Sequence, residues 1–297
     1  MAPLIQAGPG ATARGPSPWL ARLGLAPHDR AVILHADDVG MCPATVSAFA
    51  ELALAGAVSS GSLMVPCPSF AAAAVFCRDH LEVDAGVHLT LTSEWESYRW
   101  GPLSEQEAAS GLLDATGCFH RDSADDADPA AAEREMRAQL DRATSAGIDV
   151  THVDCHMFAA FHPRLFPGYL RVARDRRLPA LVWRDLAGED QRRQVEEWEQ
   201  AGLPVLDAVA WLPLGEVADR WEQARAIFDE LPAGVTHLIL HPAHDGPELR
   251  AIARDWPARV ADFELFRSGR PREYLQRRGV HVIGYRALRS LLPARGA

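Results

Sequence analysis

The chain has 297 residues, of which 48% are hydrophobic and 24% charged, with 22 glycines and 21 prolines. These proportions exclude collagen-like, disordered and coiled-coil chains, and the length suits one large α/β domain. Acidic residues number 40 and basic residues 30, so the formal charge is -10 and no basic surface is predicted for nucleic acid or an anionic membrane. Every basic residue is arginine, which excludes Schiff-base chemistry on lysine and Walker-type phosphate binding.

Residues 1–29 are rich in alanine, glycine and proline, and they lack the basic start and continuous apolar run of a signal peptide. We expect a flexible leader at 1–29 and a single (β/α)-barrel domain at 30–293. No segment has the length and apolar character of a membrane span, and the five cysteines form no C-x-x-C pair, which predicts reduced thiols. We therefore expect a cytoplasmic protein, and a homo-oligomer is left open.

From residue 30 onward, short apolar runs alternate with longer amphipathic segments, as is typical of β-α units around a mainly parallel sheet. Strands are predicted at residues 31–35, 61–65, 85–91, 150–153, 180–183, 208–212, 235–240 and 280–283. Helices are predicted at residues 43–55, 69–79, 129–146, 163–176, 190–201, 218–231 and 248–261. Roughly seven or eight such units favour a TIM-like barrel over an open sheet.

The connection at residues 93–128 is too long for an ordinary β-α loop, and loops of this length are usually functional or disordered. It contains Trp95, Tyr98 and Trp100, followed by a run of aspartates. Aromatic faces suit the apolar face of a sugar ring, so Trp95 and Trp100 are candidate substrate contacts. Both side chains could instead be packing residues, and the sequence leaves the two roles open.

Two adjacent carboxylates, Asp37 and Asp38, follow the first predicted strand, at the end where a barrel has its active site. Neighbouring carboxylates repel each other unless a cation neutralises them or one keeps a proton. The pair therefore indicates a metal ligand or an acid/base group. The alternative is that one aspartate caps the next helix while the other is solvated.

Alternation along residues 86–92 places His88 on a polar strand face with Thr90 and Thr92. In a barrel, His88 then points into the polar mouth, where it can ligate a metal or contact a substrate. A single strand histidine is also commonly a hydrogen-bonded core residue.

His152, Asp154 and His156 share one face if the preceding strand continues that far. Three metal-competent side chains then converge, and Asp154 is close enough to hold the second nitrogen of a ligating imidazole. His241 stands at the end of a later strand, because Pro242 prevents its continuation. It is a candidate general acid, or it caps the strand end.

Four separated motifs occur in the order of a known family. They are HADDVGM at 35–41, GVHLTLT at 86–92, THVDCH at 151–156 and HP at 241–242, and they resemble the YdjC-like carbohydrate deacetylases, which include chitooligosaccharide deacetylase. The resemblance implies a distorted (β/α) barrel. It also implies one divalent metal ion held by Asp38, His88 and His156, with Asp37 as the catalytic base and His241 as the acid. We expect zinc or magnesium, although two imidazoles and one carboxylate can also hold manganese, iron or cobalt.

The activity implied by this resemblance is metal-dependent removal of an N-acetyl group from a mono- or oligosaccharide. Arg184, which follows a Leu-Val-Trp run, is similar to the family's basic residue near the base. The chain differs from the family's common pattern at His35, where asparagine is usual, at Met157 and Phe158, where further histidines are usual, and at Ala243, where glycine is usual. We expect these differences to alter substrate contacts rather than the metal ligands.

Two other functions are compatible with the motifs. His152 and Asp154 could be the His-x-Asp pair of a non-haem Fe(II) oxygenase, with a late histidine and Arg250 as the oxoacid contact. That function requires a double-stranded β-helix, whereas long helical segments separate the candidate residues here. A non-catalytic metal- or sugar-binding barrel is the other alternative, and the presence of both Asp37 and His241 argues against it, because binding alone needs no acid/base pair.

Overall fold

The computed structural model describes residues 5–6 and 17–293, apart from residues 106, 123, 187 and 216. Its strands form one sheet in the order β1-β6-β7-β2-β3-β4-β5, with β8 paired to β2. Every pairing of these strands is parallel except that of β1 with β6. The predicted α/β class with mainly parallel strands is therefore confirmed. The strands are β1 (Ile5–Gln6), β2 (Arg30–Val39), β3 (Ser60–Leu63), β4 (Ala85–Leu89), β5 (Val150–Cys155), β6 (Ala208–Trp211), β7 (Gly234–Leu240) and β8 (Val280–Val282).

An irregular segment carries the sheet round from β5 toward β6. Val153 of β5 bridges to Ala180, and Trp183 bridges to Leu206, two residues before β6. The strand predicted at 180–183 is present only as these single bridges. Pro179 and Pro204 lack the N–H groups that a longer ladder would need at this point. The wall of the barrel is distorted here for that reason.

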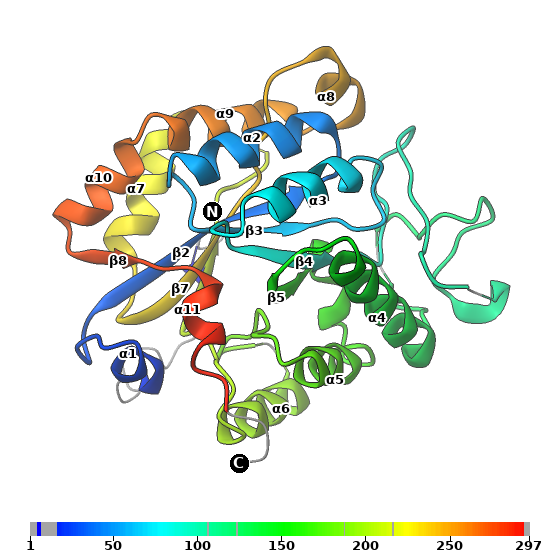
Figure 1. Ribbon diagram of the computed structural model, residues 1–297, viewed down its shortest axis with the longest axis horizontal. Helices are drawn as coiled ribbons and strands as arrows, with labels where there is room; N and C mark the ends of the chain where they lie inside the picture. The colour runs from blue at the N-terminus through cyan, green and yellow to red at the C-terminus, as the bar shows by residue number, and fades with distance from the viewer. Residues whose placement is uncertain are drawn as a thin grey trace.

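Helices surround the strands. In Figure 1, α2, α3 and α9 lie on one side of β2 and β3, while α4, α5 and α6 lie beside β4 and β5 on the other side. The helix predicted at 248–261 is divided, because Pro257 lies in the first turn of α9 and starts a new helix. The helices are α1 (Pro18–Arg22), α2 (Pro43–Leu54), α3 (Phe70–Asp79), α4 (Pro129–Ser145), α5 (Phe166–Arg176), α6 (Glu189–Gln200), α7 (Arg220–Glu230), α8 (Pro247–Ile252), α9 (Trp256–Arg267), α10 (Arg270–Arg277) and α11 (Tyr285–Arg289), with 3-10 turns η1 (Ala108–Ser110) and η2 (His156–Phe161).

The expected leader is described only in part. Residues 1–4 and 7–16 lie outside the described residues, whereas β1 pairs with β6 and α1 buries Trp19 and Leu20. The division into 1–29 and 30–293 stays a prediction. Among the helices of the described chain, none is long and apolar enough to cross a membrane.

The long connection at 93–128 extends outward beside α4 (Figure 1). Leu113 and Phe119 form an antiparallel bridge within it. Buried Glu135 of α4 accepts hydrogen bonds from the backbone N–H groups of Leu103 and Ser104. These contacts give the loop a defined path over one end of the barrel.

Candidate functional site

Asp37 and Asp38 lie within the last part of β2, which runs beyond the predicted end at residue 35. Side chains along a regular strand point to alternate faces. Here the register against β3 shifts between Ala36 and Val39, and Asp38 has a positive φ of 61°. This bulge interrupts the alternation, so both carboxylates line the same cavity.

Asp38, His88 and His156 meet at the carboxyl ends of β2, β4 and β5. Each offers one ligand atom, and these atoms all lie within 4.8 Å of one another. Oδ1 of Asp38 is 3.4 Å from Nε2 of His88 and 3.1 Å from Nδ1 of His156. The structure thus brings together the three residues that the sequence suggested as metal ligands. With Asp37, they form what we call the cavity floor.

Asp154 orients the first imidazole, in the supporting position expected from the sequence. Oδ1 of Asp154 is 2.9 Å from Nδ1 of His88, and Ser62 donates a hydrogen bond of 2.8 Å to its other oxygen. Because Nδ1 is held in this way, Nε2 of His88 faces Asp38. Burial would lower the pKa of His88, but Asp154 and Asp37 outweigh that effect and raise it well above its usual value.

Glu94 orients the second imidazole, and our sequence reasoning missed it. Nε2 of His156 lies 2.9 Å from Oε2 of Glu94, which leaves Nδ1 facing Asp38. Burial would lower the pKa of His156, but Glu94 and Asp38 raise it to about 9. The signal was present, since Glu94 is the next alternate position after His88, Thr90 and Thr92.

Arg259 of α9 holds the other oxygen of Asp38. Its Nη1 lies 2.7 Å from Oδ2 of Asp38, and its Nε lies 2.8 Å from Asp255. Burial would raise the pKa of Asp38, but Arg259 and His156 hold it well below its usual range. Asp38 is therefore a carboxylate at neutral pH.

The donor set fits a divalent cation. Oδ1 of Asp38 is buried and has no hydrogen-bond partner, although an imidazole nitrogen lies on either side of it. A buried acceptor left unpartnered is costly unless an unseen partner satisfies it. Two imidazoles and one carboxylate are typical ligands of zinc, and both imidazoles have the carboxylate support common at such sites.

Asp37 lies beside this set. Its Oδ2 is 3.8 Å from Nε2 of His88, and its buried Oδ1 has no hydrogen-bond partner. Burial raises the pKa of Asp37 to about 7; His88 opposes the shift, and the negative charge of Asp154 adds to it. A carboxyl group with such a pKa can accept and release a proton near neutral pH.

His241 directly follows β7, and its side chain also lines the cavity. Its backbone N–H donates a hydrogen bond of 2.9 Å to Asp262, while Nδ1 of its ring has no partner. Burial of the ring lowers the pKa of His241 to about 3, although Asp38 opposes the shift. The imidazole is therefore neutral at rest.

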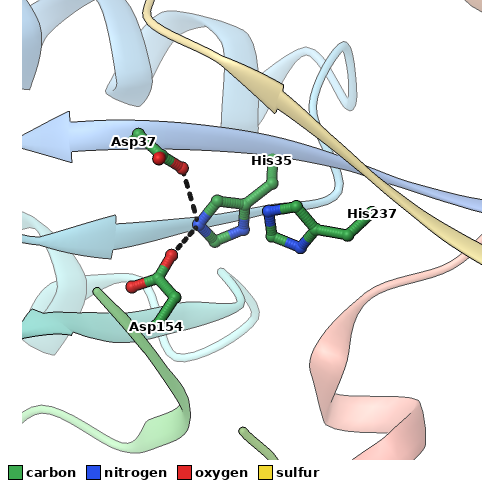
Figure 2. A group of neighbouring side chains, drawn as sticks. All are labelled: His35, Asp37, Asp154 and His237. Atoms are coloured by element: carbon green, nitrogen blue, oxygen red, sulfur yellow. Dashed lines mark ion pairs between the residues drawn. The ribbon is translucent and has the colours of Figure 1, made fainter. Parts of the chain in front are cut away.

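A second group of titratable side chains, which we call the lower group, lies deeper in the barrel. It consists of His35, Asp37, Asp154 and His237, whose ligand atoms also lie within 4.8 Å of one another. Figure 2 shows His35 between the two carboxylates, with Nε2 2.9 Å from Asp154 and 3.4 Å from Asp37. Nδ1 of His35 is 2.7 Å from the hydroxyl of Ser60. Both ring nitrogens of His35 have protein partners, whereas Oδ1 of Asp37 and Nε2 of His237 have no hydrogen-bond partner.

His152 lies against the lower group and not at the cavity. Its ring stacks on Tyr285 with 3.9 Å between centroids, and it meets the edge of His35. Gly86 lies next to this ring, where a Cβ atom would overlap it. His152 and His156, which were predicted to share a face with Asp154, therefore lie at two different depths in the barrel: His152 beside the lower group and His156 at the cavity floor.

The cavity above the floor has a volume of about 500 Å³. Trp95 lines it, whereas Trp100 is 3% exposed and does not. The indole N–H of Trp100 donates a hydrogen bond of 2.8 Å to the carbonyl of Thr92, and its ring meets the edge of His156. The structure thus separates the two candidate substrate contacts, leaving Trp95 on the cavity surface and Trp100 as a packing residue behind the site.

Arg184 does not lie near the candidate base. Its guanidinium pairs with Glu199 and, at 3.0 Å, with Asp207, which is the residue that directly precedes β6. The basic residue at the site is instead Arg259. No local motif marks Arg259, which reaches Asp38 from α9 across 221 positions of sequence.

Comparison with known proteins agrees with the motifs. The family model described as YdjC-like protein matches residues 31–277. The chain belongs to the YdjC-like family. Among its relatives, a carbohydrate deacetylase of Thermus thermophilus is 33% identical over 284 residues, which cover 92% of this chain and 98% of that protein. A carbohydrate deacetylase of Brevibacillus brevis is 25% identical over 260 residues, covering 86% and 99%.

A solved structure of another protein has a similar fold. The crystal structure of a protein named as a cellobiose-phosphate cleavage protein, from Enterococcus faecalis, matches with a TM-score of 0.76. The two are 22% identical, and the match covers 88% of this chain and 99% of that one. The mainly parallel α/β fold is not the double-stranded β-helix that the oxygenase alternative needs, and Arg250 pairs with exposed Asp245 outside the cavity lining. The oxygenase alternative is wrong.

Proposed function

We propose that this YdjC-like protein is a metal-dependent hydrolase that removes the N-acetyl group from a mono- or oligosaccharide. The observation that carries the proposal is the convergence of Asp38, His88 and His156 on the cavity floor beside Asp37. Its relatives named as carbohydrate deacetylases support the substrate class. An acid/base pair beside candidate ligands supports an enzyme over a binding module.

One divalent ion, zinc or magnesium, would be held by Asp38, His88 and His156. When bound, it would polarise the amide carbonyl and lower the pKa of water at the site. The two imidazoles favour zinc, because magnesium prefers oxygen ligands. Arg259 keeps Asp38 charged, and Asp154 and Glu94 hold the imidazoles of His88 and His156 with their other nitrogens facing Asp38, where the ion would bind.

Asp37 is the proposed base. Its place on the cavity lining, with Oδ2 facing His88, and its pKa of about 7 suit a group that takes a proton from the attacking water, while Oδ1 faces the lower group. His35 contacts that same oxygen at 3.4 Å and limits its movement.

His241 is the proposed donor to the leaving nitrogen. Because its imidazole is neutral at rest, it cannot begin the reaction as an acid. It acts only after negative charge develops in the cavity and raises its pKa, so that it takes up the proton that Asp37 removed from the water and passes it to the leaving amine. The products are acetate and an amino sugar.

The test is acetate release from a panel of N-acetylated mono- and oligosaccharides, measured with metal-loaded protein and with chelated protein. We expect release from at least one sugar, loss of that release after chelation, and recovery when zinc or magnesium is restored. Equal activity before and after chelation, with metal content confirmed by elemental analysis, contradicts the metal-dependent reaction.

A further inference from the structure

Apolar side chains make up much of the cavity lining. The exposed and half-buried ones, which we call the outer wall, are Trp95, Met157, Phe158, Trp211, Pro213 and Leu214, and half-buried Glu94, His241 and Asp255 line the cavity beside them. Buried apolar side chains that include Leu181 and Ile239 also line the cavity. The cavity thus combines apolar side chains that water reaches with others that it does not.

Met157 and Phe158 are the unusual members of the outer wall. Met157 is 45% exposed and Phe158 is 38% exposed, although large apolar side chains are normally covered. Both residues also have left-handed backbone conformations, with φ of 51° and 54°. A side chain with a Cβ atom rarely adopts this conformation, and such strain gathers at functional sites.

Neighbouring contacts keep both side chains at the cavity. The hydroxyl of Thr92 lies 3.5 Å from the sulfur of Met157. The ring of Phe158 meets the edges of Phe161 and Trp183, at centroid distances of 5.5 and 6.0 Å. The strained turn after His156 therefore presents two apolar side chains at a fixed position.

The charged groups of the cavity do not suit an anionic substituent. Among the described residues that line it, Arg259 is the one permanent cation, and its guanidinium is committed to Asp38 and Asp255. Glu94 and Asp255 add negative charge beyond the ligand set. A phosphate on the sugar would thus meet carboxylates without a free arginine.

We propose that the outer wall binds an apolar aglycone, so that the substrate is an uncharged N-acetylated amino sugar carrying an alkyl or aryl group at its glycosidic oxygen. This inference rests on the proposed function, which positions the acetamide at the cavity floor. The ring carbon that bears the glycosidic oxygen is next to the carbon that bears the acetamide, so a group on that oxygen leaves the sugar close to the floor, where Met157 and Phe158 directly follow the candidate ligand His156.

Phe158→Asn is the sharpest variant. Asparagine accepts the left-handed backbone better than phenylalanine, so the turn should persist while the apolar ring is lost. Val75→Asn is the matched control, because Val75 is 47% exposed on α3 and lies outside the cavity lining. Melting temperature and zinc content verify that both variants are folded and loaded.

The first measurement is KM for acetate release from the methyl glycoside, the phenyl glycoside and the 6-phosphate of N-acetylglucosamine, and from the N-acetylated disaccharide. We expect a KM roughly tenfold lower for the phenyl than for the methyl glycoside, as partial burial of one aromatic ring gives. Phe158→Asn should reduce this ratio to about twofold, whereas Val75→Asn should retain it. Equal KM values for the two glycosides, or a lower KM for the phosphate or the disaccharide, would overturn the inference.

A second measurement separates this inference from the proposed function. Calorimetric titration of the chelated protein compares binding of the phenyl and methyl glycosides without turnover. Tighter binding of the phenyl glycoside that Phe158→Asn abolishes, together with no acetate release from any sugar, supports the apolar subsite and contradicts the deacetylase. Acetate release without tighter binding of the phenyl glycoside supports the deacetylase and contradicts the apolar subsite.

Discussion

Two groups of histidines share the interior of this barrel, and their surroundings favour opposite charge states. At the cavity floor, His88 contacts three carboxylates and His156 contacts two, and these carboxylates raise the pKa values of both imidazoles despite burial. In and beside the lower group, burial lowers the pKa values of His152 and His237 well below the usual range, and nearby His35 adds to the effect. The same side chain is thus a ligand candidate at one depth and a neutral packing residue at the other.

Asp154 joins the two depths. It accepts hydrogen bonds from Ser62 and contacts His88 on one side and His35 on the other. Asp37 has the same position between the groups, since it faces both His88 and His35. All four imidazoles are buried, so nearby carboxylates rather than burial explain why the pKa values of His88 and His156 are raised while those of His152 and His237 are lowered.

The largest effect should come from removing an imidazole of the cavity floor. We expect His88→Ala or His156→Ala to reduce bound zinc to below about a tenth of the wild-type content and to abolish acetate release, because two ligands hold zinc poorly. The matched control is His237→Gln, which should keep its metal. Elemental analysis measures the metal, and full occupancy in both alanine variants would refute the ligand assignment.

Asp37→Asn should leave the metal bound and lower kcat by about 10²- to 10⁴-fold, because an amide has nearly the same shape but cannot take the proton. Metal content and kcat are measured on the same preparation. An empty site in this variant, with Asp38 intact, would mean that the roles of the two aspartates are reversed.

His35 tests the link between the two groups. Replacing it by leucine removes its contacts with Asp37 and Asp154, and we expect kcat to fall by about 10- to 100-fold with little change in KM. His35→Gln retains an N–H donor and should recover most of the activity. If the leucine and glutamine variants lose kcat equally while both melt like wild type, His35 does not position these carboxylates.

Trp95 is half-buried on the cavity surface, whereas Trp100 is buried behind the site. Trp95→Ala should raise KM by about three- to tenfold, a loss of uniform substrate binding. Trp100→Ala should instead destabilise the fold by about 3–5 kcal/mol, because it leaves a large cavity behind His156. Both variants are measured by kinetics and by denaturant unfolding. A raised KM for Trp100→Ala with unchanged stability would contradict its role as a packing residue and make it a substrate contact.

The smallest effect concerns the lower group and pH. Because the pKa of His237 is lowered in the folded state, its contribution to stability is present above about pH 6.5 and is lost as pH falls below that value. Each such group adds a slope of up to about 1.4 kcal/mol per pH unit. His237→Gln should flatten the fall in unfolding free energy between pH 6.5 and 5, whereas His28→Gln, at an exposed position, should not. Equal slopes in wild type and His237→Gln would show that His237 titrates normally.

Local pattern predicted most of the strands and marked Asp37, Asp38, His88 and His156 as candidate functional residues, although the strand predicted at 180–183 is present only as single bridges. Strand periodicity placed His88 on the inner face, and the spacing of Asp154 and His156 predicted a ligand beside its support. These predictions succeeded because the residues lie on strands whose side-chain direction follows a period of two. The parallel arrangement then brings the carboxyl ends of β2, β4 and β5 to one edge.

The sequence by itself indicated the mainly parallel α/β class and, through four motifs, the family, and the resemblance to that family implied that Asp38, His88 and His156 act together. Only the tertiary structure decided that a bulge turns Asp38 to the side of Asp37, that Arg259 rather than Arg184 lies at the site, and that a lower group exists at all. His35, His237 and Tyr285 come from distant segments of the chain, and nothing in the sequence around each of them indicates that their side chains meet. Contacts of this kind depend on how whole strands and helices pack, and neither hydrophobic periodicity nor motif spacing carries that information.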